Sequence, residues 1–207
     1  MELRVLSLYP DQMNIYADRG NILFLQRRCE WRGIGFVHSG AGPGEPVDPA
    51  AHDLFYIGGG QDRDQRAVAA DMVASKREAI AAAADDGAVL LAVCGGYQLL
   101  GHSYQMGEEK LPGLGIADLE TVRESGPRLI GNVAIEADLG TGPRLIAGFE
   151  NHGGRTYLGT DATPLGKVVS GHGNNDRDGF EGVRRDNVIG TYLTARCCRR
   201  TPGWPTT

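Results

Sequence analysis

The chain has 207 residues, enough for one domain with a substantial core and short for two. Its formal net charge is −5 and 41% of its residues are hydrophobic, which is an ordinary soluble composition without the basic surface of a nucleic-acid-binding protein. No run of about 18 apolar residues occurs, and the first ten residues resemble a strand rather than a signal peptide. We therefore expect a cytoplasmic protein.

Two residue types carry further information. Glycine accounts for 31 of the 207 residues, about twice its usual share of roughly 7%, which predicts many tight turns and close backbone approaches. The four cysteines, Cys29, Cys94, Cys197 and Cys198, show no zinc-ligand spacing. In a reducing compartment none of them needs a disulfide partner. We expect neither a metal site nor a bound cofactor.

In the first half of the chain, short apolar runs alternate with helical patterns. Strands are predicted at residues 4–8, 35–38, 54–57 and 89–93, and helices at residues 20–31, 66–85 and from 97 onward. This alternation predicts an α/β fold of the flavodoxin-like, doubly wound type, with a mainly parallel sheet and helices on both faces.

The second half contains shorter strands with few helices between them. They are predicted at residues 119–121, 131–135, 145–149, 167–170 and 188–192. We expect them to extend the sheet as antiparallel or irregular strands. Residues 40–49 and 171–178 are predicted to be loops.

Cys94 lies where a buried strand meets a helix. The sequence VLLAVCGGYQLLG, from Val89 to Gly101, places two glycines directly after it, as in a nucleophile elbow. A thiol at a helix N-terminus has a lowered pKa, and the N–H of Gly95 would point to where an oxyanion develops. The alternative is that Cys94 is a small buried hydrophobe, as most free cysteines are.

Three glycines follow another strand in YIGGGQD, from Tyr56 to Asp62. They supply backbone N–H groups at the carboxyl edge of the sheet, where doubly wound proteins bind ligands. Three glycines alone are also typical of a flexible turn. They indicate a functional site mainly because the Cys94 elbow follows one β-α unit later.

Taken together, these segments resemble the class I glutamine amidotransferases, in the branch shared with cobyric acid synthase. LYPDQMNIYADRGN (Leu8–Asn21) and GFENHGGRTYLG (Gly148–Gly159) narrow the resemblance to the glutaminase subunits of lipid II isoglutaminyl synthases. The resemblance implies that the chain hydrolyses glutamine and passes ammonia to a Mur-ligase-like, MurT-type partner. That partner would use ATP to amidate the α-carboxyl of D-glutamate in lipid II, a step of peptidoglycan synthesis.

The resemblance also implies roles for particular residues. Cys94 matches the nucleophile, and Gly59 or Gly60 together with Gly95 match the oxyanion-hole backbone. Arg128, in ESGPRLIGN, matches an arginine that holds the glutamine substrate, and an arginine fork suits an α-carboxylate. Without the resemblance Arg128 would be interpreted as a solvated surface residue. Gln98 is a further candidate for the pocket lining.

The chain departs from the family pattern near its C-terminus. The family continues Gly-Thr-Tyr-Leu-His-Gly-Pro-Leu-Leu-Pro-Lys-Asn-Pro, in which the histidine is the general base. This chain reads GTYLTARCCRRTP from Gly190 to Pro202, so Thr194 occupies the position of the base. Deleting one nucleotide from GC-rich codons for the family tail yields this sequence from Thr194 onward. We therefore interpret 1–193 as the amidotransferase domain and 194–207 as an aberrant, frameshifted tail, and we expect a C-terminal element of the family to be missing.

Three functional hypotheses remain open from the sequence. The first is an active glutaminase subunit, with His152 of the FENHGG motif as a weak substitute for the missing base. The second is a catalytically dead subunit that only binds its partner. The third is a cysteine peptidase or thioesterase on the same scaffold, which the Arg128 segment and the LYPDQMNIYADRGN start disfavour. The source of an acidic third member of the triad stays open, the partner subunit included.

Overall fold

A six-stranded sheet forms the centre of the fold in the computed structural model, which describes residues 1–15 and 18–194. Its strands are Glu2–Leu8 (β1), Gly35–Ala41 (β2), Leu54–Ile57 (β3), Val89–Val93 (β4), Val183–Arg185 (β13) and Val188–Thr191 (β14). They lie in the order β13-β14-β4-β3-β1-β2, and every neighbouring pair is parallel except β13 with β14. The predicted mainly parallel sheet is confirmed.

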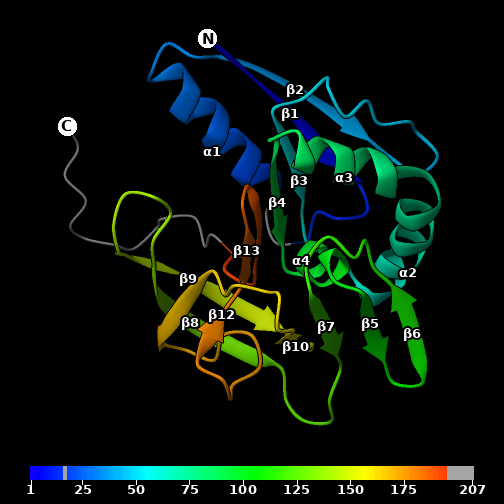
Figure 1. Ribbon diagram of the computed structural model, residues 1–207, viewed down its shortest axis with the longest axis vertical. Helices are drawn as coiled ribbons and strands as arrows, with labels where there is room; N and C mark the ends of the chain where they lie inside the picture. Colours follow the sequence, from blue (N-terminus) through cyan, green and yellow to red (C-terminus); the bar gives the residue numbers. More distant parts are fainter. Residues whose placement is uncertain (16–17, 195–207) are drawn as a thin grey trace.

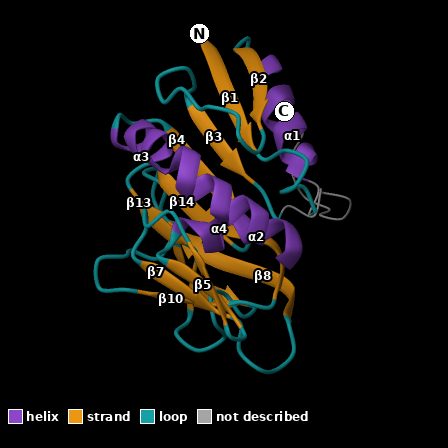
Figure 2. Cartoon of the chain, turned by 90° about the vertical axis from the view of Figure 1, so that its right-hand side faces the viewer, coloured by secondary structure: helices purple, strands orange, loops and turns teal. Residues whose placement is uncertain are grey.

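Helices cover both faces of this sheet. They span Asp18–Glu30 (α1), Asp62–Asp71 (α2), Arg77–Asp85 (α3) and Gly95–Leu100 (α4). The connections β1-α1-β2 and β3-α2-α3-β4 run in opposite directions along the sheet. Right-handed crossovers therefore place α1 on one face and α2 with α3 on the other, as Figures 1 and 2 show. The doubly wound arrangement is confirmed.

The helix predicted over residues 66–85 begins earlier and is interrupted. A π-helical turn, Met72–Lys76, separates α2 from α3. Within it, the fully buried ammonium of Lys76 lies 2.7 Å from Asp71 Oδ2. The hydroxyl of Tyr9 donates to the same oxygen at 2.7 Å, so this irregular turn ties the helix to the end of β1. Alanine-rich composition predicts a helix here but not the wider turn that lets a lysine point inward.

The prediction for the second half of the chain is wrong in its arrangement. Only β13 and β14 extend the central sheet, and β14 is parallel to β4. The other strands form two separate four-stranded sheets, in the orders β10-β7-β5-β6 and β12-β11-β8-β9. These strands are Ser103–Met106 (β5), Glu109–Pro112 (β6), Leu119–Val122 (β7), Leu129–Ala137 (β8), Arg144–His152 (β9), Arg155–Leu158 (β10), Gly166–Ser170 (β11) and Phe180–Glu181 (β12).

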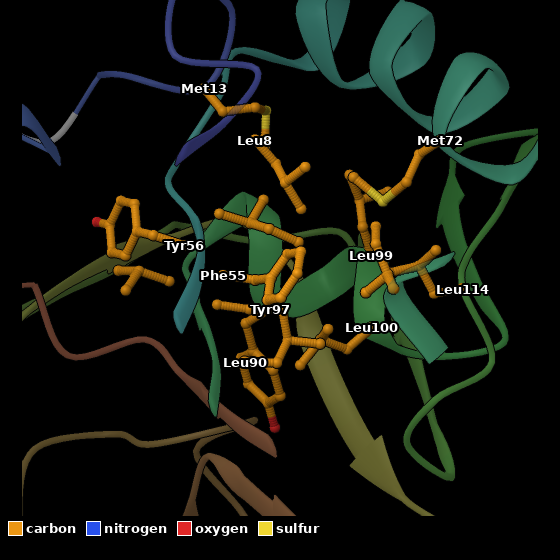
Figure 3. Packing of buried hydrophobic residues seen from close by; sticks show 14 of the residues in the cluster. Leu8, Met13, Phe55, Tyr56, Met72, Leu90, Tyr97, Leu99, Leu100 and Leu114 are labelled. Atoms are coloured by element: carbon orange, nitrogen blue, oxygen red, sulfur yellow. The ribbon is translucent and has the colours of Figure 1, made fainter. Parts of the chain in front are cut away.

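The main core lies between the central sheet and its helices. Figure 3 shows Phe55 and Leu90 from the sheet packing near Tyr97, Leu99 and Leu100 of α4. β4 is apolar throughout because a central parallel strand is covered on both faces. A smaller apolar cluster lies in the sheet that contains β8 and β9. In the part of the chain that the structure describes, no helix is long and apolar enough to cross a membrane.

Candidate active site

The turn that carries Cys94 has the geometry of a nucleophile elbow. Cys94 has φ 52° and ψ −107°, a left-handed conformation that a residue with a Cβ rarely adopts. Its N–H donates to the carbonyl oxygen of Thr191 at 2.9 Å, and its carbonyl accepts the N–H of Gln98 at 3.1 Å. Figure 1 shows α4, which follows this turn, where the central sheet meets β5 and β7. The strained turn holds the buried thiol at the carboxyl edge of the sheet.

The glycine-rich loop after β3 lies against this elbow. Gly96 donates to the carbonyl oxygen of Gly58 at 2.9 Å. A Cβ added to Gly95 would lie 3.0 Å from the nitrogen of Gly60, so the two backbones are adjacent. Gly60 lines the cavity beside Cys94, whereas the carbonyl oxygen of Gly59 accepts the N–H of Ile15 at 3.1 Å. Of the two predicted glycines, Gly60 is the one that lines the cavity, where an oxyanion-hole N–H would have to lie.

A cavity of about 440 Å³ opens beside the thiol. Its lining includes both regions that the sequence singled out and several residues that it did not: Ile15, Gly60, Gln61, Arg63, Gln65, Cys94, Gln98, Tyr104, Arg123, Arg128, Asn151, His152 and Gly153. The volume suits a ligand the size of an amino acid or somewhat larger. Within the residues that the structure describes, no cluster of histidine, cysteine and acidic side chains could hold a metal ion.

Arg128 reaches this cavity from the loop before β8. Its Nε donates to Asn151 Oδ1 at 2.8 Å and its Nη2 donates to the Asn151 carbonyl oxygen at 2.7 Å. A Cβ added to Gly153 would lie 3.4 Å from Arg128 Nη1 and 3.7 Å from Arg123 Cζ. The two guanidinium groups therefore flank Gly153 on one wall of the cavity. This arrangement suits a carboxylate, which accepts paired hydrogen bonds from arginine.

Gln98 lines the cavity and also connects it to the core. Its Oε1 accepts Gln65 Nε2 at 2.9 Å, and its Nε2 donates to the hydroxyl of Tyr192 at 3.2 Å. The side chain is 4% exposed. Both ends of the amide are thus occupied by protein groups. The position agrees with the predicted pocket lining, and the contacts indicate that Gln98 fixes the pocket wall.

Thr194 does not line the cavity. Its hydroxyl donates to the carbonyl oxygen of Phe149 at 2.6 Å, and its backbone pairs with Phe149 on β9. It nevertheless lies on the segment that leaves β14 beside Cys94, at the position where the sequence resemblance predicts the base. A threonine hydroxyl held by a carbonyl oxygen cannot take a proton from a thiol near neutral pH. Residues 195–207, which hold the rest of the predicted frameshifted tail, lie outside the described residues.

His152 also lines the cavity, and its two ring nitrogens differ in their contacts. Its Nδ1 lies 2.8 Å from the carbonyl oxygen of Gly154, and its Nε2 lies 3.8 Å from Glu150 Oε2. The ring stacks on Tyr192 with centroids 3.5 Å apart and an interplanar angle of 4°. The Nδ1 contact and the ring stacking agree with a structural role, whereas the buried Nε2 has no hydrogen-bond partner among the described residues.

Several residues of the site were not found from the sequence, and Gln65, Arg123 and Tyr192 are three of them. Gln65 and Arg123 are single polar residues on α2 and after β7, with no motif around them. Tyr192 contacts the cavity wall indirectly: its hydroxyl accepts Gln98 Nε2 and lies 2.6 Å from Thr156 Oγ1. In the sequence, Tyr192 belongs to the GTYL segment that agrees with the family pattern. That agreement did not predict the contacts of Tyr192 with Gln98 and Thr156.

Comparison with known proteins identifies the family of this chain. Residues 4–197 match the CobB/CobQ-like glutamine amidotransferase domain. The chain is 41% identical over 194 residues to the lipid II isoglutaminyl synthase (glutamine-hydrolyzing) subunit GatD of Staphylococcus aureus, covering 93% of this chain and 76% of that protein. It is 38% identical over 193 residues to GatD of Streptococcus pneumoniae, covering 93% and 73%. A probable cobyric acid synthase of Methanopyrus kandleri is 40% identical over 129 residues, covering 56% and 25%.

Solved structures show the same fold. PurLQS from Thermotoga maritima superposes with a TM-score of 0.65 at 18% identity, covering 93% of this chain and 87% of that one. A glutamine amidotransferase from Thermotoga maritima superposes with a TM-score of 0.58 at 15% identity, covering 92% and 75%. The chain therefore belongs to the CobB/CobQ-like glutamine amidotransferase family. Its likeness to the two GatD subunits extends over far more of both chains than its likeness to the cobyric acid synthase does.

Proposed function

We propose that this chain is the glutaminase subunit of a lipid II isoglutaminyl synthase, acting with a Mur-ligase-like partner in the cytoplasm. The observation that carries the proposal is the elbow at Cys94, adjacent to Gly60 and open to a cavity with two arginines on one wall. Similarity to GatD over 93% of the chain supports the acceptor and the partner. ATP would be used by that partner, so this chain would need no cofactor of its own.

The geometry supports a defined sequence of steps. The Cys94 sulfur attacks the carboxamide carbon of glutamine while Arg128 and Arg123 hold the α-carboxylate. The oxyanion forms beside the N–H groups of Gly60 and Gly95. The C–N bond breaks, the nitrogen takes the proton that the thiol gave up and leaves as ammonia, and a thioester remains. Water then cleaves the thioester, which releases glutamate and restores the thiol.

A second candidate is an inactive subunit that binds its partner without making ammonia. The contact of Thr194 with Phe149 favours it, because a threonine hydroxyl that donates to a carbonyl oxygen cannot serve as the base at this position. This candidate differs from the first only in the proton transfers, since a positioned base is worth about 10²–10⁴ in rate. Nucleophile, oxyanion hole and arginines are common to both.

The test traces the amide nitrogen of glutamine into the product. The chain and a Mur-ligase-like subunit would be given lipid II, ATP and glutamine labelled with ¹⁵N in its amide, and the D-glutamate α-carboxamide would be analysed for label. Ammonium chloride in place of glutamine serves as the control for the ligase. The active glutaminase is supported if ¹⁵N enters the carboxamide with the unaltered chain and does not enter it with Cys94→Ala. Amidation from ammonium should persist in that variant. Amidation from ammonium alone supports the inactive subunit, and no amidation from either source would contradict both.

A further inference from the structure

Two glutamates are completely buried near the last strand of the central sheet. Glu150 on β9 and Glu181 on β12 are both 0% exposed. Burial raises the pKa of Glu181 to about 8, and the charge of Glu150 contributes to the rise. A buried carboxyl group destabilises a fold unless its oxygens are hydrogen-bonded, so the partners of each group indicate what it holds in place.

Glu181 holds three consecutive residues that follow β14. The N–H of Tyr192 donates to Glu181 Oε1 at 2.6 Å. Thr191 Oγ1 lies 3.1 Å from Oε1 and 3.0 Å from Oε2 of the same carboxyl group. Leu193 joins through its N–H, which donates to Thr191 Oγ1 at 3.0 Å. One side chain thus anchors the backbone from Thr191 to Leu193.

The anchored segment is in direct contact with the nucleophile. The carbonyl oxygen of Thr191 accepts the N–H of Cys94 at 2.9 Å. The hydroxyl of Tyr192 accepts Gln98 Nε2 on the cavity wall. The next residue is Thr194, at the position of the family base. A shift of this segment would therefore displace the thiol and the cavity wall together.

Glu150 provides a matched contrast. Its two oxygens accept the N–H groups of His172 at 2.7 Å and Gly173 at 2.9 Å, in the loop after β11. It is buried as deeply as Glu181, but it forms no hydrogen bond with the described segment from Thr191 to Leu193. Its nearest approach to that segment is through His152, whose Nε2 lies 3.8 Å from Glu150 Oε2 and whose ring stacks on Tyr192. Loss of either carboxyl group would create a similar defect in packing. Loss of Glu181 removes hydrogen bonds to the segment beside Cys94, whereas loss of Glu150 removes hydrogen bonds to the loop after β11.

We propose that Glu181 is a positioning residue, which fixes the reactive geometry of Cys94 by anchoring the segment from Thr191 to Leu193. This inference rests on the proposed role of Cys94 as the glutaminase nucleophile. Glu181 accepts the N–H of Tyr192 and the hydroxyl of Thr191. A glutamine side chain of the same length can accept that N–H with its amide oxygen and donate to Thr191 Oγ1 with its amide nitrogen. Glu181→Gln should therefore keep the anchoring hydrogen bonds, and Glu181→Ala should lose them.

The experiment labels the intact chain with a chloroketone analogue of glutamine. The maximal rate of Cys94 alkylation and the analogue's half-saturating concentration are measured separately, and the labelled cysteine is identified by peptide mapping. Glu181→Ala lowers the maximal rate by about tenfold or more, because small misplacement of a reacting atom is costly. The half-saturating concentration stays within about twofold, because the arginines that hold the carboxylate are unchanged. Glu181→Gln recovers most of the rate.

Three controls separate positioning from loss of folding. Glu150→Ala changes the maximal rate much less than Glu181→Ala, and an equal fall in both would overturn the inference. Cys29, which is 7% exposed, remains unlabelled as long as the fold is intact. Thr191→Val keeps the side-chain shape and removes the hydroxyl, so it also lowers the maximal rate. An unchanged rate in Thr191→Val or Glu181→Ala would contradict the anchor alone, whereas an unaltered chain that is not labelled at Cys94 would contradict the proposed function as well.

Discussion

The N–H of Cys94 donates to the carbonyl oxygen of Thr191 at 2.9 Å, which joins the nucleophile turn to the last strand of the central sheet. These two residues are far apart in the sequence and adjacent because β4 and β14 are parallel neighbours. The contact places the C-terminal segment beside the thiol. A change in that segment therefore acts directly on the backbone of Cys94.

Cys94 should be the more reactive of the two cysteines in the described part of the chain. Both Cys94 and Cys29 are 7% exposed, so accessibility alone does not distinguish them. Cys94 lies at the N-terminus of α4 and opens on the cavity, which favours its thiolate and admits a ligand. Mild alkylation with a glutamine-mimicking electrophile, followed by peptide mapping, should identify Cys94. Preferential labelling of Cys29 would contradict the elbow assignment. Cys197 and Cys198 are counted separately.

Arg128→Ala should weaken binding of the glutamine analogue. Loss of a bidentate, charge-assisted contact costs on the order of 2 kcal/mol, or roughly thirtyfold in affinity. The concentration dependence of Cys94 labelling measures this change. Arg66→Ala is the matched control, because Arg66 pairs with Glu109 and does not line the cavity. An affinity that is equal in Arg128→Ala and the unaltered chain would show that Arg128 does not hold the substrate.

Gly96→Ala should destabilise the elbow. A Cβ there would lie 2.6 Å from the carbonyl oxygen of Ile57 and 2.9 Å from that of Gly58, and these backbone atoms cannot move aside cheaply. We expect a loss of unfolding free energy on the order of 3 kcal/mol, measured by denaturant titration. Gly131→Ala is the control, because a Cβ there meets nothing within 4 Å. Equal stability of the two variants would contradict the close packing of α4 on the glycine loop.

Acid should weaken the anchor between β1 and α2. Burial opposes ionisation of Asp71, but hydrogen bonds from Lys76 and Tyr9 outweigh it and lower the pKa of Asp71 to about 2. A lowered pKa contributes stability above the unfolded value of 3.8, and this contribution is lost as the pH falls toward about 2. The loss is about 2 kcal/mol over that window. Asp71→Asn should make the unfolding free energy less dependent on pH there, and an unchanged slope would contradict the ion pair.

The first half of the fold could be predicted from the sequence because its signals are local. The all-apolar run from Val89 to Val93, followed by Cys94 and two glycines, determines a buried strand, a turn and a helix within thirteen residues. The second half could not be predicted in the same way. β7 is bonded to β5 on one side and to β10 on the other, so its sheet depends on pairings with segments distant in the chain.

The residues of the candidate site likewise fall into those that local motifs predict and those that depend on distant contacts. Cys94, Gly95 and Gly60 lie in glycine-rich motifs that predict tight turns at strand ends from the sequence alone. Arg123 and Gln65 gain their roles only because β7 and α2 meet at the cavity. The position of Glu181 between the sheets likewise depends on β12, a strand of two residues that no periodic pattern would reveal.

The most direct test of the account compares this chain with one whose reading frame is restored before the codon of Thr194. Restoration should replace Thr194 and the following residues with His-Gly-Pro-Leu-Leu-Pro and supply the missing base. With the Mur-ligase-like partner present and at equal concentrations, release of ammonia from glutamine should rise by about 10²–10⁴ in the restored chain. Equal ammonia release from the two chains would contradict the account, because it would show that the base of Cys94 does not belong at position 194.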